Sequence, residues 1–174
     1  MILFKTLVFF LSLLFFSTAV AGFGRILSSK ISRNFFQDVF LGFVTISFII
    51  TIIHFFFKIN LLISFLIFIF GVANFFYKSK FFLSNLIKRE NIYYFLIVFL
   101  LIPIFLSQKY HEDFGYYHLP YALSFIEEKI IFGFANIDKP YVYNSIWLNL
   151  YSIFFLNEKD YNFITLPSFL FFLS

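Results

Sequence analysis

Four long stretches of this chain carry no charged residue, and they constrain its fold more than any other feature. They cover residues 6–24, 39–57, 61–77 and 91–106. At a rise of about 1.5 Å per residue, helices of this length reach roughly 24 to 28 Å, close to the ~30 Å of hydrocarbon that a spanning helix crosses. The pattern predicts an all-α fold, a polytopic transmembrane helix bundle with four spans in residues 1–106. Pro103 predicts a kink near the end of the fourth span, because proline removes a backbone donor.

The composition excludes several classes of soluble protein. Of the 174 residues, 61% are hydrophobic and 13% are charged, whereas a soluble domain is about one quarter charged. This is too little charge for the surface of a soluble enzyme, and a disordered tail would need far higher polarity. The absence of cysteine excludes a disulfide-rich secreted module. The net charge of +4 comes from basic residues scattered between apolar runs, so no nucleic-acid partner is predicted.

A fifth apolar run, residues 161–174, reaches the last residue of the sequence. It is shorter than the roughly 17 to 25 residues that a spanning helix needs. We expect it to be the start of a fifth transmembrane helix in the N-terminal part of a longer protein. Residues 107–160 then form a loop outside the membrane.

The basic residues predict the orientation of the spans. Two alternate connections are rich in Lys and Arg: Arg25, Lys30 and Arg33 follow the first stretch, and Lys78, Lys80, Lys88 and Arg89 follow the third. The connection between residues 57 and 61 carries only Lys58. By the positive-inside rule the two basic connections are cytoplasmic, which leaves the N-terminus and residues 107–160 extracytoplasmic.

A cleavable signal peptide is the competing interpretation of the N-terminus. Lys5, the apolar run that follows it and the small-residue sequence Ala19, Val20, Ala21 match the three parts of such a peptide. Cleavage would invert every downstream segment and place residues 107–160 in the cytoplasm. The alternation of basic connections favours a retained first helix instead.

Residues 107–160 predict two amphipathic or interfacial helices. Pro120 suits a first helical turn, and apolar residues recur after it at helical spacing, at Leu119, Ala122, Leu123, Ile126, Ile130 and Ile131. This predicts an amphipathic helix on the membrane surface or against the bundle, with Gly133 as its stop. A second apolar stretch, residues 146–156, is too short to span and predicts an interfacial or re-entrant helix.

Part of this loop carries a resemblance to a known group of proteins. The residues that carry it are Asp113, Tyr117, His118, Leu119 and Pro120, then Gly133, Ala135 and Asn136, then Asn144, Ser145 and Trp147. Over residues 110–150 this pattern resembles the first external loop of uncharacterised bacterial polytopic membrane proteins that are similar to GT-C class membrane glycosyltransferases. In many such enzymes that loop follows the first helix, whereas here it follows four predicted helices.

The resemblance implies sugar transfer from a polyprenyl-phosphate carrier at the outer face of a bacterial inner membrane. Asp113 is the implied catalytic residue, either as general base for an acceptor hydroxyl or as ligand of a divalent cation beside the phosphate. The resemblance assigns substrate binding to four residues, His118, Tyr117, Trp147 and Asn144. The implied partners are membrane lipid and a lipid-linked sugar donor.

Each of these residues also has a structural interpretation. Tyr117 and Trp147 could anchor the chain at the membrane interface, His118 could bond locally at a helix start, and Asn144 could cap a helix. The spacing of His111, Asp113 and His118 matches no zinc signature, so no metal-ligand set is predicted. His54, near the external end of the second stretch, is interpreted as an interfacial residue.

Two other functions remain open on the sequence alone. One is a transporter or flippase component for lipid-linked saccharides, although the four stretches carry no charge in their interiors. The other is a structural membrane subunit without a site.

The predicted orientation can be mapped with single cysteines, because the chain has none of its own. Cysteines placed in residues 107–160 are expected to react with an impermeant maleimide added to intact cells. Cysteines placed in the two basic connections are expected to react only after permeabilisation. The opposite labelling pattern would show that the sidedness is reversed.

Overall fold

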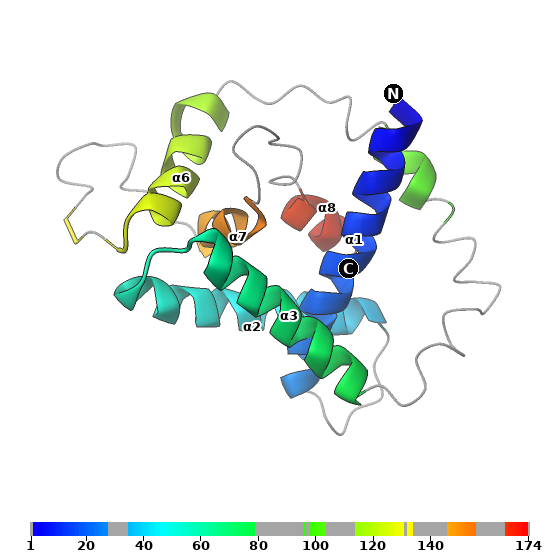
Figure 1. Ribbon diagram of the computed structural model, residues 1–174, viewed down its shortest axis with the longest axis horizontal. Coiled ribbons are helices and arrows are strands. Elements are labelled where there is room, and N and C mark those ends of the chain that lie inside the picture. Colours follow the sequence, from blue (N-terminus) through cyan, green and yellow to red (C-terminus); the bar gives the residue numbers. More distant parts are fainter. Residues whose placement is uncertain are drawn as a thin grey trace.

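The computed structural model describes residues 2–27, 35–78, 96, 98–103, 114–130, 132–133, 146–155 and 166–173. These residues form helices, together with the connection 57–60 and a few residues after α6 and α7, and they contain no strand. The elements are α1 (Ile2–Leu27), α2 (Phe35–Phe56), α3 (Leu61–Lys78), the π-helical turn η1 (Phe114–His118), α6 (Leu119–Glu127), α7 (Ile146–Phe154) and α8 (Leu166–Leu173). Figure 1 shows their arrangement. The predicted all-α fold class is thus confirmed.

Two helices are long and apolar enough to cross a membrane. They are Leu3–Leu27 in α1 and Phe35–Phe56 in α2, and the shorter apolar helix Leu61–Tyr77 follows them. These helices correspond to the first three predicted spans. Residues 98–103, which end at Pro103, are helical, and α8 lies in the predicted fifth span. Four complete spans and a fifth remain predictions.

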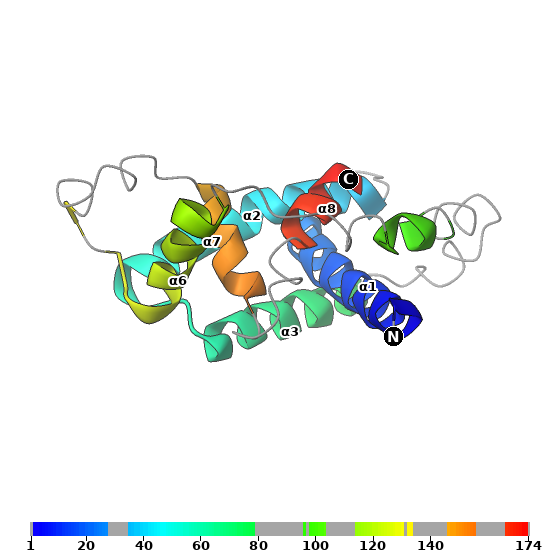
Figure 2. The ribbon, with the colours of Figure 1, turned by 90° about the horizontal axis from the view of Figure 1, so that it is seen from above.

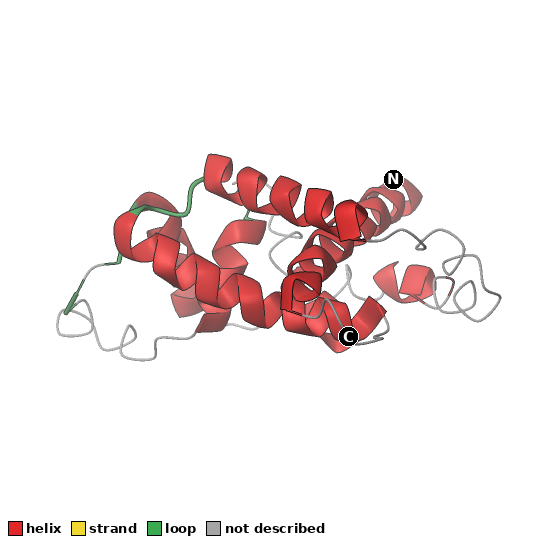
Figure 3. Cartoon of the chain, turned by 90° about the horizontal axis from the view of Figure 1, so that it is seen from below, coloured by secondary structure: helices red, strands yellow, loops and turns green. Residues whose placement is uncertain are grey.

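Helices α1, α2 and α3 meet where α1 ends, α2 begins and α3 ends. From there α1 leads away, whereas α2 and α3 run to the connection 57–60 that joins their other ends (Figures 1 and 3). Their backbones touch at glycine positions. A Cβ added at Gly22 would collide with the carbonyl of Gly71, and one added at Gly42 would collide with the carbonyl of Val20. The Asn74 amide of α3 also donates to the Gly22 carbonyl. Close approach of this kind is typical of helix pairs in membranes, where packing replaces the hydrophobic effect.

An ion pair closes the same junction. Arg25 Nε donates to Asp38 Oδ2 at 2.9 Å, joining the last turn of α1 to the first turn of α2. The guanidinium also lies 3.9 Å from the centre of the Phe75 ring, and its Nη1 donates to the Phe75 carbonyl at 3.4 Å. Each charge stands at the helix end that favours its sign. The sequence placed Arg25 in a connection, which is wrong because α1 continues to Leu27.

The proposed signal-peptide cleavage region lies inside this packing. Ala19, Val20 and Ala21 are 0% exposed, in the middle of a continuous α1. A peptidase would need these residues extended and accessible. Their burial against α2 and α3 favours the retained first helix.

Helix α7 is buried among α1, α2 and α3. The Phe154 ring lies 5.1 Å from the rings of Phe16 and Phe68, which are themselves 4.6 Å apart in edge-to-face contact. Leu150 and Ile153 belong to the same core. Figure 2 shows α7 beside α6, with α8 next to α1 and α2. Helix α7 is thus packed inside the protein, and its position as an interfacial or a re-entrant helix stays a prediction.

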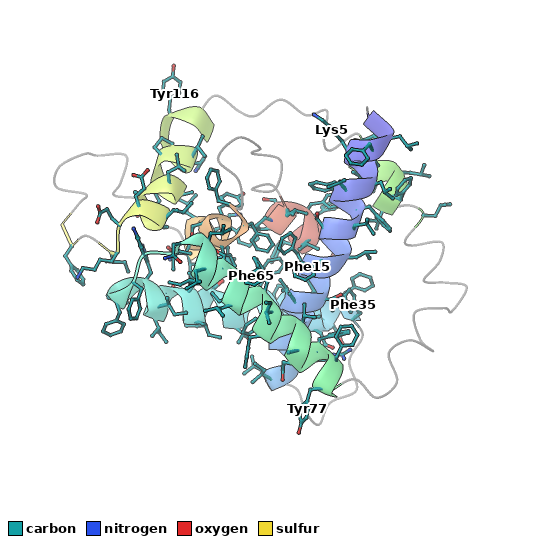
Figure 4. The ribbon with its side chains drawn as sticks, in the orientation of Figure 1. Lys5, Phe15, Phe35, Phe65, Tyr77 and Tyr116 are labelled. Atoms are coloured by element: carbon teal, nitrogen blue, oxygen red, sulfur yellow. The ribbon has the colours of Figure 1, made fainter. Side chains whose placement is uncertain are left out.

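The outer faces of α2 and α3 are apolar and uncovered. The exposed side chains include Phe40, Val44, Phe48 and Ile52 on α2, and Leu62, Phe65, Leu66, Ile69 and Phe70 on α3. Figure 4 shows the labelled Tyr77 and Tyr116 pointing outward at opposite edges of the molecule. Soluble monomers rarely expose so large an apolar surface.

The glycine contacts predict a position-specific effect of one methyl group. Gly22→Ala is expected to lower the free energy of unfolding in detergent by about 1–3 kcal/mol, because the new Cβ must push α1 from α3. Gly115→Ala is the matched control, since a Cβ there meets nothing within 4 Å. Equal stability of the two variants in a denaturation series would contradict close packing at Gly22.

Candidate functional site

Helix α6 is attached where α2 ends and α3 begins, at the opposite end of these two helices from the Arg25–Asp38 pair. We call the residues His54, Ile59, Phe125, Glu128 and Ile130 the α6 junction. They come from the end of α2, the connection 57–60, and the end of α6 with the residues after it. This junction fixes the helix that follows the predicted catalytic segment.

His54 lies at the centre of the α6 junction. Its side chain is 0% exposed, and its Nε2 lies 3.1 Å from the Glu128 carbonyl oxygen. Because a carbonyl only accepts, Nε2 carries the proton in this contact. The ring also packs edge-to-face on Phe125 at 4.4 Å. The sequence did not predict that α6 and the residues after it cover the ring.

Backbone hydrogen bonds complete the junction. The Ile59 amide donates to the Phe125 carbonyl at 2.8 Å, and the Ile130 amide donates to the His54 carbonyl at 3.1 Å. The connection is itself held by Asn60, whose Oδ1 accepts from the Ile63 amide at 3.0 Å and caps α3. Helix α6 is thus attached to the α2–α3 connection through main-chain groups as well as through the histidine.

The predicted amphipathic helix forms, but it is shorter than expected. Helix α6 has proline in its first turn, and Glu128 after it is extended. Gly133, predicted as the stop, lies beyond the helix with a φ of 80°. Ile130, assigned to the apolar helix face, instead contributes its amide to the α6 junction.

Helix α6 packs against the rest of the protein through two apolar clusters. As predicted, Ala122 is buried together with Leu119, Leu123 and Ile126, and this cluster includes Phe155. A second cluster joins Tyr121 and Phe125 to Leu148 of α7. Tyr121 and Phe125 lie outside the predicted aliphatic pattern, so the sequence did not predict the second cluster.

The predicted site residues fall into three groups. Asp113 and Asn144 lie outside the described residues. Tyr117 lies in η1, and His118, which is exposed, ends that turn without a side-chain capping bond. Trp147 is half-buried, with ring centres 6.0 Å from Phe43 and 5.3 Å from Phe171. These contacts give Trp147 a packing role between α2, α7 and α8.

A buried asparagine was missed by the sequence analysis. Asn149 on α7 is 5% exposed, and its Oδ1 has no hydrogen-bond partner among the described residues. The nearby Tyr151 hydroxyl, by contrast, lies 2.8 Å from Ser168 Oγ and links α7 to α8. The sequence contained one sign of this buried polar group, a single amide side chain within the apolar stretch 146–156. Buried polar atoms without partners are uncommon and call for a functional or structural explanation.

No metal centre is found in the part of the chain that the structure describes. There, no group of three or more His, Cys, Asp or Glu could hold an ion. The divalent cation implied for Asp113 involves a residue outside that part.

These features define an all-helical protein with two helices suited to cross a membrane and a shorter helix fixed to one end of them. The chain belongs to the family described as Domain of unknown function (DUF8201), whose model matches residues 1–174. Comparison with curated proteins gives no significant match, and comparison with solved structures gives none either.

Two asparagine substitutions are expected to have opposite effects on stability. Asn149→Leu removes a buried acceptor without a described partner, so the free energy of unfolding should stay equal or rise by about 1 kcal/mol. Asn60→Leu removes the cap of α3 and should lower it by about 1 kcal/mol. Both are measured by denaturation in detergent. A loss at Asn149 as large as that at Asn60 would indicate a polar partner for Asn149.

Proposed function

We propose that this chain is a polytopic integral membrane protein that acts at the extracytoplasmic face of a bacterial inner membrane. The observation that carries the membrane assignment is the uncovered apolar surface of α2 and α3. The helices pack through glycine, and their exposed sides are phenylalanine, leucine and isoleucine. This combination is stable in lipid and unfavourable in water.

The arrangement of the helix ends supports the proposed sidedness. The end of α1, the start of α2 and the end of α3 share the Arg25–Asp38–Phe75 contact. These ends adjoin both Lys/Arg-rich connections, which therefore leave the core on one side. Helix α6 is attached at the other end of α2 and α3. If the basic side is cytoplasmic, α6 lies outside.

The proposed reaction is sugar transfer from a polyprenyl-phosphate carrier. An acceptor hydroxyl would attack the anomeric carbon while the bond from that carbon to the phosphate oxygen breaks, and the phosphate would leave with the electron pair. The Asp113 carboxylate would take the hydroxyl proton, or hold a divalent cation beside the phosphate. The resemblance of residues 110–150 to GT-C loops supports this role.

The attachment of α6 is the structural support for such a site. Asp113 immediately precedes η1, and η1 leads directly into α6. The α6 junction fixes the end of α6 against the core. The segment before α6 is therefore connected to a helix whose position is fixed. Positioning of this kind is a large part of catalysis by enzymes that hold a phosphate leaving group beside an acceptor.

A flippase or transporter for lipid-linked saccharides is the second candidate. It is favoured by the buried polar atoms His54 Nδ1 and Asn149 Oδ1, which have no partners among the described residues. Polar groups inside a membrane bundle often mark substrate pathways. In that case, Asn149→Leu would stop movement of the lipid-linked saccharide while Asp113→Asn would leave it unchanged.

Removal of one carboxylate tests the transferase proposal. Asp113→Asn is expected to reduce sugar transfer from lipid-linked donors by at least about 100-fold, because general-base catalysis contributes on this scale. Membrane insertion, followed by the cysteine map, should not change. Glu112→Gln is the matched control and should retain transfer. Full transfer by Asp113→Asn would refute the role of this carboxylate.

A further inference from the structure

The α6 junction contains a titratable group whose free nitrogen is buried. His54 Nε2 donates to the Glu128 carbonyl, so the neutral ring has its lone pair on Nδ1. Nδ1 is buried and has no hydrogen-bond partner among the described residues. When α6 is attached, a neutral imidazole therefore has a hydrogen bond at Nε2 and none described at Nδ1. The ring packs against the ring of Phe125.

The position of His54 couples this ring to the attachment of α6. The same residue accepts the Ile130 amide on its carbonyl, and its ring touches Phe125, whose carbonyl accepts the Ile59 amide. The side-chain bond and the ring contact of His54 thus join α2 to the end of α6. Displacing the ring removes the bond to the Glu128 carbonyl and the contact with Phe125, and leaves the two main-chain hydrogen bonds to hold α6 at this end.

Among the described residues, none accepts a hydrogen bond from His54 Nδ1. The ionisable side chains on the packed elements are Lys58 on the connection, Tyr121, Glu127, Glu128 and Lys129 on or after α6, and Tyr151 on α7. Lys58, Glu127, Glu128 and Lys129 are exposed. Tyr121 packs against Phe125 and Leu148, and Tyr151 contacts Ser168 and Trp147. None of these groups has a described hydrogen bond to Nδ1.

We infer that His54 is a proton-operated latch that holds α6 on the membrane helices when neutral and releases it when protonated. A proton added to Nδ1 would place a charge in a closed apolar contact, at a high cost in free energy. The same charge costs little when the ring reaches water. A falling pH therefore favours the state in which α6 has left the ring. This latch does not depend on sugar transfer.

The location of the latch suits a sensor of external pH. His54 lies in the last turn of α2, at the end that carries α6. Histidine is the side chain that ordinarily changes charge between about pH 5 and 8. Release of α6 would also free the segment that begins with Asp113, so acid outside the cell would loosen the proposed site.

Cysteine accessibility in the full-length chain in lipid vesicles tests the latch. Ala122 on the buried face of α6 is 0% exposed, and Tyr116 in the preceding turn η1 is 79% exposed. The measured quantity is the maleimide reaction rate of Ala122→Cys divided by that of Tyr116→Cys at the same pH. With His54 present, this ratio is expected to rise at least about tenfold between pH 8 and pH 5. A ratio that stays constant would overturn the latch.

Two variants of His54 complete the design. In His54→Gln the amide can donate to the Glu128 carbonyl but does not titrate, so the ratio should stay low at both pH values. In His54→Phe the ring contact with Phe125 is kept without the donor, so the ratio should be raised equally at both. A pH-dependent ratio in either variant would show that another group is responsible. Fluorescence of the single tryptophan, Trp147, checks that the core remains folded.

Discussion

The close contact of α1 with α2 and α3 is the constraint on which the rest of the structure depends. Lipid provides no hydrophobic drive between helices, so association must come from packing and internal polar contacts. Gly22, Gly42 and Gly71 allow the backbones to touch, and the buried Asp38 is neutralised by Arg25 at the same junction. At their other ends α2 and α3 are joined by the connection 57–60, and α7 contacts both of them.

Two buried polar side chains differ from the hydroxyl groups of α1 and α2. Ser12, Thr18, Thr45, Ser47 and Thr51 each donate to a main-chain carbonyl four residues earlier in the same helix. Such hydroxyls are satisfied locally and do not mark a site, because the helix itself provides their partner. By contrast, His54 Nδ1 and Asn149 Oδ1 have no hydrogen-bond partner among the described residues. That contrast identifies them as the unusual groups of the core.

The α6 junction connects this core to the segment with the proposed chemistry. Helix α6 is short, and isolated helices of nine residues are unstable in water. Its stability therefore comes from its contacts with α7 and with the α2–α3 connection. Because an isolated helix of this length is unstable, the loss of the His54 contact shifts the balance between the attached and the released state. The same junction thus gives the proposed site both its position and a means of control.

The sequence by itself determined the helical class, the first three apolar helices and the amphipathic segment after Pro120, because the length and spacing of apolar residues depend only on chain geometry. It also indicated that residues 146–156 are too short to span. Only the tertiary structure decided that α7 is buried, that Arg25 pairs with Asp38, and that His54 is covered by α6. The reason is that helical periodicity defines the faces of one helix, whereas burial of a polar residue depends on which other helix covers that face.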